Sequence, residues 1–345
     1  MSAVTKPVRL AYRDEKGRLR MNEEAASILL LVKGPIGVVS VCGPAQLGKS
    51  YISNQLMGRT SGFEVGRRPY NPDHCTEGLW MWFSPSTKTA DDGTNYNILV
   101  IDTEGSDSPY GEKCLYLAVV LSSMLIYNQM GDIDGTSFHY VSVVTKMVNT
   151  MAGDITASEF KQFFPMFFVW LLRDFTLCLG EMTPCEYMDD FALKPLDVCE
   201  CPEDVKYVNE LNKVKTSIKD LFVGRHCFIF HRPSLEEKKL LILDKVPVRC
   251  LRKEFREGVK ELRSLIFEKT KPKKIGATVV TGPIFVQITR YVIDALNNGK
   301  RPTIACILEH VEKTKRPKAL KSATIATVFD DPPAANTRQR KRMLS

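Results

Sequence analysis

The stretch Val38-Val39-Ser40-Val41-Cys42-Gly43-Pro44-Ala45-Gln46-Leu47-Gly48-Lys49-Ser50 decides the fold expected for this chain. Residues 38–42 are a β-branched run typical of a buried strand, residues 43–50 match the pattern G-x-x-x-x-G-K-S, and residues 49–57 have helical spacing. This order predicts a phosphate-binding loop, because the glycines let backbone N–H groups turn inward and the helix N-terminus adds partial positive charge. Lys49 would then face the β- and γ-phosphates, and Ser50 would supply an oxygen to Mg²⁺.

Apolar runs that alternate with helical patterns predict an α/β fold of the P-loop NTPase type, a mostly parallel sheet with helices on both faces. Strands are expected at residues 38–42, 79–84, 96–101, 167–172 and 227–230, and a buried helix running into a strand at 115–127. Helices are expected at 49–57, 135–151, 247–270 and 282–298, with a helix end at 217–221. Residues 1–20 are expected to be a polar segment with a short strand and hairpin, residues 21–312 the folded domain, and residues 313–345 a basic, disordered tail.

The composition is that of a globular protein, with 44% hydrophobic and 26% charged residues. No apolar run reaches the ~18–20 residues that a membrane-spanning helix needs. Neither end of the sequence shows a signal peptide or a prenylation motif, so we expect a soluble intracellular protein without a lipid anchor. The ten cysteines are expected to be thiols, because the one tight pair, Cys199 and Cys201, lacks the second pair that a zinc site needs.

Positive charge is concentrated near the end of the sequence. Residues 311–345 carry nine Lys/Arg and three Asp/Glu, which is +6 of the chain's net charge of +8. The rest of the chain is therefore nearly neutral and does not favour a nucleic-acid partner. The cluster Arg338-Gln339-Arg340-Lys341-Arg342 is either a solvated terminus or a nuclear-import signal, so the expected location is the cytoplasm or the nucleus.

Two further strand ends carry side chains suited to a nucleotide. The strand at 97–101 runs into Asp102-Thr103-Glu104-Gly105, where Asp102 would hold Mg²⁺ through water and the Gly105 N–H would sense the γ-phosphate. The strand at 169–172 ends in Arg173-Asp174. An Asp carboxylate can accept both the N1–H and the exocyclic amine of guanine, a pair of donors that adenine lacks. The alternative is an exposed ion pair at a strand end, since the usual Asn-Lys-x-Asp guanine motif is missing.

Several motifs in combination resemble the large GTPase domain of the guanylate-binding proteins, a dynamin-like family. They are the phosphate loop, Thr76-Glu77-Gly78-Leu79-Trp80-Met81-Trp82, Asp102-Thr103-Glu104-Gly105, Leu172-Arg173-Asp174-Phe175, Cys227-Phe228-Ile229-Phe230-His231-Arg232-Pro233 and Thr281-Gly282-Pro283. The runs at 119–123 and 127–131 are most similar to the plant guanylate-binding-like branch, and the similarity covers residues 5–310.

The resemblance implies a GTPase that binds GTP with Mg²⁺, hydrolyses it slowly, pairs head to head as a homodimer or as a heterodimer with a related GTPase, and acts in defence or stress. Thr76 would complete the Mg²⁺ coordination and Glu104 would order the attacking water. Arg173 and Asp174 would read guanine, and the loop that begins at Arg232 would cap the base. The implied residues are Gln46, Thr76 and Glu104 for catalysis; Gly43, Gln46, Leu47, Gly48, Lys49, Ser50, Tyr51, Asp102, Gly105, Arg173, Asp174 and Arg232 for the nucleotide; and Ser50, Thr76 and Asp102 for the metal.

The chain departs from the family pattern at three places. Gln46 stands where the family has an Arg that neutralises transition-state charge on dimerisation, a group worth ~10³–10⁵ in rate, and Arg67 or Arg68 could substitute for it. The segment before Thr76, including His74, looks expanded, and the segment after Gly105 looks shortened. These departures and the missing helical region of the family favour a second hypothesis, a catalytically impaired pseudo-GTPase that binds and regulates a full-length relative. The intact binding residues favour an enzyme, and both hypotheses stay open.

Overall fold

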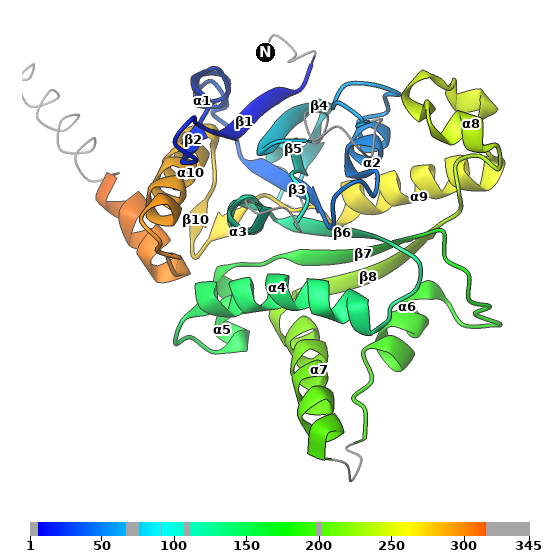
Figure 1. Cartoon of the computed structure of the whole chain (residues 1–345). Coiled ribbons are helices and arrows are strands. Elements are labelled where there is room, and N and C mark those ends of the chain that lie inside the picture. Colours follow the sequence, from blue (N-terminus) through cyan, green and yellow to red (C-terminus); the bar gives the residue numbers. More distant parts are fainter. Residues whose placement is uncertain (1–5, 67–75, 91, 107–110, 198–201, 315–345) are drawn as a thin grey trace, which may run out of the picture.

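The computed structural model describes residues 6–66, 76–90, 92–106, 111–197 and 202–314. Its strands are β1 Val8–Arg13, β2 Leu19–Met21, β3 Ile36–Cys42, β4 Leu79–Thr89, β5 Asn95–Thr103, β6 Met124–Met130, β7 Phe167–Arg173, β8 Gly224–Phe230, β9 Lys274–Ile275 and β10 Thr278–Val279. In this part of the chain, β1 to β8 form one sheet in the order β2-β1-β4-β5-β3-β6-β7-β8 (Figure 1). The strands from β5 to β8 in that order run parallel, and β4, β1 and β2 add an antiparallel edge, so the predicted mostly parallel sheet is confirmed.

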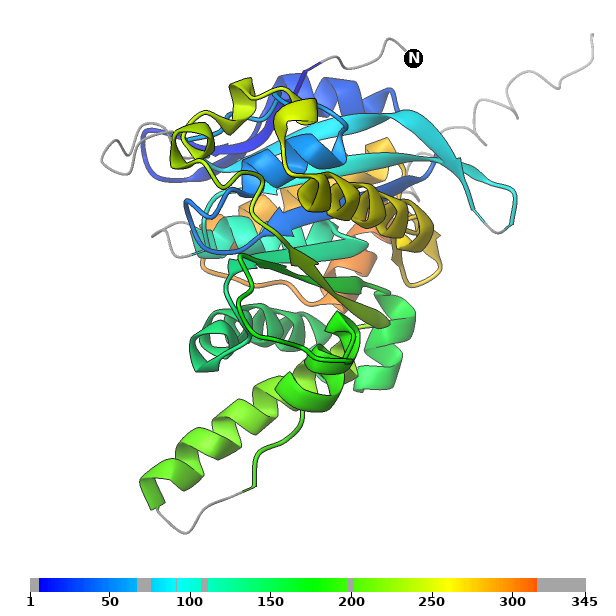
Figure 2. The ribbon, with the colours of Figure 1, turned by 90° about the vertical axis from the view of Figure 1, so that its right-hand side faces the viewer.

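The helices lie mostly where the sequence predicts them. They are α1 Glu23–Leu30, α2 Lys49–Leu56, α3 Gly111–Leu121, α4 Gly135–Ala152, α5 Ala157–Phe163, α6 Pro184–Glu186, α7 Pro202–Leu221, α8 Glu237–Leu240, α9 Lys253–Lys269 and α10 Gly282–Asn297. A π-helical turn, Tyr187–Ala192, follows α6. Figures 1 and 2 show α7 projecting away from the sheet. Within the described residues, every helix is too short or too polar to cross a membrane.

Helices cover both faces of the sheet, as predicted. Because successive residues of a strand point to opposite faces, β3 contributes to two separate apolar clusters. Val38 and Cys42 pack with residues of α3, α4 and α10, whereas Val39 and Val41 pack with residues of α2 and α9. Figure 2 shows α9 lying across one of these faces. The phosphate loop expected after β3 therefore emerges from the middle of a sheet that is buried on both sides.

Elements of the structure extend across the positions of the domain boundaries predicted after residues 20 and 312. The sequence analysis set residues 1–20 apart, but β1 and β2 form the expected hairpin inside the main sheet, where β1 pairs with β4. Leu10 and Ala11 are fully buried there, which explains why this segment belongs to the domain. At the other end, residues 304–314 are helical, so the predicted boundary after residue 312 falls within a helix. The tail from residue 315, with its basic cluster, lies outside the described residues.

The helix predicted at residues 247–270 begins later than expected. α9 starts at Lys253, and residues 248–250 form a 3-10 turn. The backbone between them is extended because the Arg252 N–H donates to the Pro233 carbonyl oxygen at 3.0 Å and the Leu251 side chain is buried. A tertiary contact to the end of β8 therefore delays the helix.

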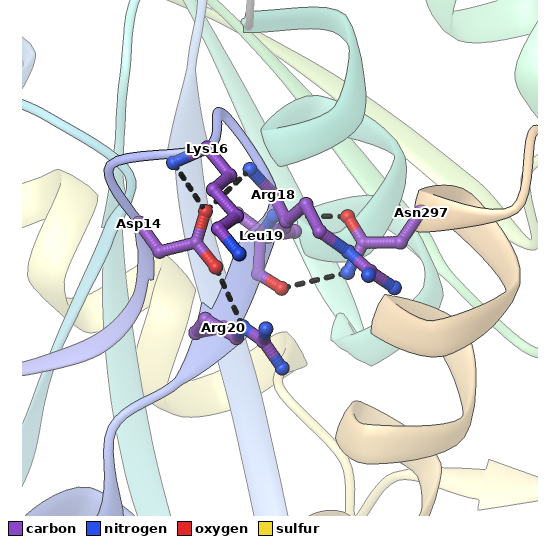
Figure 3. Close-up of polar contacts among 6 residues, drawn as sticks. All are labelled: Asp14, Lys16, Arg18, Leu19, Arg20 and Asn297. Atoms are coloured by element: carbon purple, nitrogen blue, oxygen red, sulfur yellow. Dashed lines mark hydrogen bonds and ion pairs between the residues drawn. The ribbon is translucent and has the colours of Figure 1, made fainter.

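The N-terminal hairpin is fastened by two polar side chains (Figure 3). The Asp14 carboxylate accepts hydrogen bonds from Lys16 N at 3.0 Å, from Arg18 N at 2.8 Å and from Arg20 Nε at 2.8 Å, which closes the turn. Asn297, at the end of α10, bonds both polar groups of Leu19: its Oδ1 accepts from Leu19 N at 2.9 Å and its Nδ2 donates to Leu19 O at 2.8 Å. The hairpin is thereby tied to the helix that covers it.

Asn297→Ala is expected to lower the free energy of unfolding by about 1–3 kcal/mol, because it leaves both backbone groups of Leu19 without partners. Urea unfolding followed by circular dichroism measures the change. Asn298→Ala is the matched control, since the Asn298 side chain only bonds the Asp294 carbonyl oxygen of its own helix. Equal stability losses in the two variants would show that the contact between hairpin and helix contributes nothing.

Candidate functional site

The loop between β3 and α2 has the backbone expected of a phosphate-binding loop. Gly43 has φ 135° and Gly48 has φ 73°, both in the region that favours glycine. A Cβ at Gly43 would lie 2.1 Å from the Asn128 carbonyl oxygen, so no other residue fits against β6 there. Gly48 caps α2, whose first turn faces the loop with its N–H groups. The predicted order of strand, loop and helix is confirmed.

Lys49 lies inside the curl of this loop. Its side chain is only 6% exposed, and its Nζ donates to the Pro44 carbonyl oxygen at 2.7 Å. The ammonium group is therefore held across the loop from the helix start, where an incoming phosphate would meet both the lysine and the N–H groups of α2. Gln46 has φ 59° and is exposed at the tip of the loop.

The three predicted metal ligands lie together beside the loop. Ser50 Oγ donates to Asp102 Oδ2 at 2.7 Å and lies 3.0 Å from Thr76 Oγ1, and Thr76 Oγ1 lies 3.5 Å from the same carboxylate oxygen. Ser53, which the sequence analysis missed, donates to Asp102 Oδ1 at 3.0 Å. Its position three residues after Ser50 places it on the same face of α2, a spacing that could have revealed it.

The chemistry of this cluster fits Mg²⁺. Asp102 is 1% exposed, and burial raises the pKa of its carboxyl group to about 6, although the Ser50 hydroxyl and the Lys49 charge oppose the shift. A buried carboxylate surrounded by hydroxyl oxygens is a set of hard donors, which Mg²⁺ prefers. No group of three or more His, Cys, Asp or Glu side chains suited to a metal ion is found elsewhere in the described residues. Cys199 and Cys201 lie outside them.

Glu104 and Gly105 join the end of β5 to the loop and to β4. Glu104 Oε2 accepts from the Gly78 N–H at 2.8 Å and from the Cys114 thiol at 3.8 Å. A Cβ at Gly105 would lie 2.5 Å from Ala45 Cβ, so this glycine lets the backbone pack against the phosphate loop. The expanded segment with Arg67, Arg68 and His74, and residues 107–110 of the shortened one, lie outside the described residues.

The predicted base-reading carboxylate lies at the end of β7. Asp174 has φ 52°, a left-handed conformation that Asp tolerates, and its N–H donates to the Phe230 carbonyl oxygen at 3.1 Å. Its Oδ2 accepts from Arg232 Nε at 2.5 Å, so the structure brings these two predicted residues together from the ends of β7 and β8. Gln46 and Asp174 are the two non-glycine residues with positive φ in the described chain, and both are predicted site residues.

Arg173 contacts the phosphate loop, a position that its predicted role in reading the base did not anticipate. It is 8% exposed, and burial lowers the pKa of its guanidinium group. Its NH1 donates to the Leu47 carbonyl oxygen at 2.7 Å. The same oxygen accepts from Asn128 Nδ2 at 2.9 Å. Asn128 was not predicted as a site residue; a polar side chain within an apolar strand was the available signal.

The side chain of Tyr51, a predicted nucleotide-binding residue, lies in the core. Its side chain is 2% exposed and stacks on Phe255, with ring centroids 6.1 Å apart, in the cluster between α2 and α9. Burial raises the pKa of its hydroxyl to about 12. The ring is therefore a core group, because the helix turns this position toward the sheet.

Comparison with known proteins supports the family that the motifs suggest. Residues 16–275 match the family described as "Guanylate-binding protein, N-terminal domain". The chain is 33% identical to guanylate-binding protein 2 of Rattus norvegicus over 308 residues and 34% identical to guanylate-binding protein 1 of Mus musculus over 307, in each case 83% of this chain and 49% of the relative. The chain thus spans about half the length of these curated relatives. A solved structure of the Era protein of Aquifex aeolicus overlaps 69% of this chain and 57% of its own, with a TM-score of 0.32 and 11% identity, too distant to add to the family match.

The buried Asp102 carboxyl group predicts a pH dependence of stability in the nucleotide-free protein. Its pKa in the folded state, about 6, lies above its ordinary value of 3.8, so its proton favours folding. This contribution is complete below pH 3.8 and is lost as the pH rises through about 6. Asp102→Asn cannot titrate at this position. Relative to that variant, the free energy of unfolding of wild type should fall by on the order of 3 kcal/mol across that window. Chemical unfolding of both proteins at several pH values measures the difference, and parallel curves would contradict the expected shift.

Proposed function

This chain belongs to the guanylate-binding protein family, and on that premise we propose that it binds GTP together with Mg²⁺ and hydrolyses the nucleotide slowly. The observation that carries the proposal is the oxygen cluster beside the phosphate loop, with Ser50 Oγ at 2.7 Å from Asp102 Oδ2 and at 3.0 Å from Thr76 Oγ1. A phosphate-binding loop next to hard oxygen ligands suits phosphoryl transfer, because this reaction depends on positioning and on charge.

The first task of the chain's own residues is to hold the phosphates. Lys49 would exchange the Pro44 carbonyl oxygen, now 2.7 Å away, for oxygens of the β- and γ-phosphates. The first turn of α2 adds its N–H groups and its partial positive charge. Ser50, Thr76 and Asp102 would hold the metal. When bound, Mg²⁺ supplies positive charge beside the phosphate oxygens.

The second task is to select the base. Asp174 would accept the N1–H and the exocyclic amine of guanine. Its left-handed backbone and the bond from its N–H to Phe230 O aim the carboxylate from the strand end. Arg232 Nε, 2.5 Å from Oδ2, would orient and neutralise the carboxylate before the base arrives. The loop that follows Arg232 is the proposed cap over the base.

Hydrolysis is proposed to be slow because the phosphate loop has a neutral tip. Gln46 can donate a hydrogen bond but carries no charge, so it cannot act as a cationic finger. Glu104, the residue proposed to order the attacking water, has one carboxylate oxygen bonded to the Gly78 N–H at 2.8 Å. This bond places the carboxylate beside the start of β4.

The same two residues favour a second candidate function. A protein that binds GTP but hydrolyses it poorly can act as a pseudo-GTPase, which pairs with a related full-length GTPase and limits its assembly. Pairing across the nucleotide face, as a homodimer or with a relative, is part of both candidates. A role in defence or stress, a place in the plant-like branch and a cytoplasmic or nuclear location belong to the same proposal and rest on the resemblance of the motifs.

Base selection by Asp174 is the test of the proposed function. Asp174→Asn turns one acceptor into a donor that faces guanine N1–H, which should weaken GTP binding by at least ~10-fold. Xanthine has an oxygen where guanine has its amine, so the affinity of the variant for XTP should rise relative to that for GTP. The Mg²⁺ requirement should be unchanged. Titration of wild type and variant with fluorescent GTP, XTP and ATP measures both effects.

Asp132→Asn is the matched control for this titration. It makes the same chemical change near the same edge of the sheet, where Asp132 Oδ1 accepts only from the Thr176 N–H at 3.3 Å. It should keep the wild-type preference for GTP. If Asp174→Asn also keeps that preference, Asp174 does not read the base.

Gln46→Arg should raise the turnover of GTP, most clearly at protein concentrations that allow dimers, because it restores a cation at the loop tip. The gain should stay below the ~10³–10⁵-fold that such an Arg is generally worth, since the segments before Thr76 and after Gly105 also depart from the family pattern. Phosphate release over a series of protein concentrations measures it, with Gln46→Ala as the uncharged control. Unchanged turnover in a variant that still binds GTP and dimerises would favour the pseudo-GTPase.

A further inference from the structure

The Leu47 carbonyl oxygen is held by two buried side chains from neighbouring strand ends. Asn128 Nδ2, on β6, donates to it at 2.9 Å, and Arg173 NH1, on β7, donates at 2.7 Å. Asn128 is fully buried and Arg173 is 8% exposed. Two hydrogen bonds to one carbonyl oxygen restrict its orientation more than one bond would. Together they fix the direction of the Leu47 peptide.

The direction of this peptide matters for phosphate binding. In a trans peptide the C=O and the following N–H point in opposite directions. Because the Leu47 carbonyl is turned toward the strand ends, the Gly48 N–H is turned the other way, into the loop. Gly48 itself has φ 73°, and a Cβ on it would lie 2.4 Å from Arg173 NH1. The guanidinium group therefore packs against the residue whose N–H it orients.

Neither side chain is fully satisfied by its present partners. Asn128 Oδ1 is buried and has no hydrogen-bond partner among the described residues. Among the described residues, Arg173 donates to the Leu47 carbonyl oxygen and forms no ion pair, and the Asp174 carboxylate favours its charged form without direct contact. A buried cation without a carboxylate partner is costly unless another anion lies nearby. The phosphate loop beside it is the place where an anion would enter.

We propose that Asn128 and Arg173 are positioning residues of the GTP site, which turn the Leu47 peptide so that the Gly48 N–H faces the β-phosphate. Arg173 thereby acts on the phosphate loop, whereas Asp174 alone of the pair reads guanine. The proposal rests on the proposed function, because it concerns the same nucleotide site. It assigns Asn128 a role that the sequence analysis did not, and it replaces the predicted role of Arg173.

The test compares nucleotide affinities of Asn128→Ala and Arg173→Gln with those of wild type. Each variant should lower the affinity for GDP on the order of tenfold, which is the effect of losing one donor to a buried carbonyl. The affinity for GMP, which has no β-phosphate, should fall less. The affinities for GTP and XTP should fall by the same factor. The preference for GTP over XTP should therefore stay at its wild-type value, in contrast to Asp174→Asn. Titration with fluorescent GDP and displacement by the other nucleotides measure all four.

Gln129→Ala is the matched control for a merely structural effect. Gln129 is the next residue of β6, is also buried, and bonds Trp170, Ser137 and the Asp132 carbonyl oxygen, away from the loop. It should lower the unfolding midpoint without changing the ratio of GDP to GMP affinity. Should Asn128→Ala not fold, Arg173→Gln tests the proposed positioning of the Leu47 peptide independently.

Three results would overturn the inference while leaving the proposed function intact. They are wild-type affinity for GDP in both variants, an equal loss of GDP and GMP affinity that Gln129→Ala shares, or a shift of base preference in Arg173→Gln like that of Asp174→Asn. A wild-type protein that binds no guanine nucleotide in the presence of Mg²⁺ would overturn the proposed function, and the inference with it.

Discussion

Asp102 lies at the end of β5 with 1% of its surface exposed, and a carboxylate so buried has to be hydrogen-bonded. Its partners are Ser50 and Ser53 from α2 and Thr76 from the segment before β4. Each of these contacts ties a helix or loop outside the sheet to β5, the strand that pairs with β3. The proposed site depends on this carboxylate, because its requirement for partners holds α2, the helix after the phosphate loop, and Thr76 in place.

The parallel part of the sheet explains how residues far apart in sequence reach one edge. β5, β3, β6, β7 and β8 are neighbours, and all end on the same side. Asp102, the phosphate loop, Asn128, Asp174 and Arg232 follow or end these strands in turn. The order of strands therefore sets the order of the proposed functions along the edge, from metal binding through phosphate binding to base recognition.

The same edge carries backbone that is unfavourable elsewhere. Gln46 and Asp174 hold positive φ although neither is glycine, and such positions persist only where the surroundings over-determine them. At Asp174 the N–H bond to Phe230 and the Arg232 contact supply that constraint. At these two positions an unfavourable backbone conformation directs the side chain. The centre of the sheet, in contrast, is well packed.

The amino-acid sequence by itself determined the features that depend on local pattern. The strand run at 38–42, the G-x-x-x-x-G-K-S loop and the acidic strand ends predicted the fold, the phosphate loop and the side chains around it, because periodicity and backbone chemistry act over a few residues. Only the tertiary structure decided which partner a buried polar group takes. It put Arg173 and Asn128 on the Leu47 carbonyl, buried the Tyr51 ring against Phe255, delayed α9 to Lys253 and drew the N-terminal hairpin into the sheet. These choices depend on neighbours brought from distant strands, and no spacing along the chain records them.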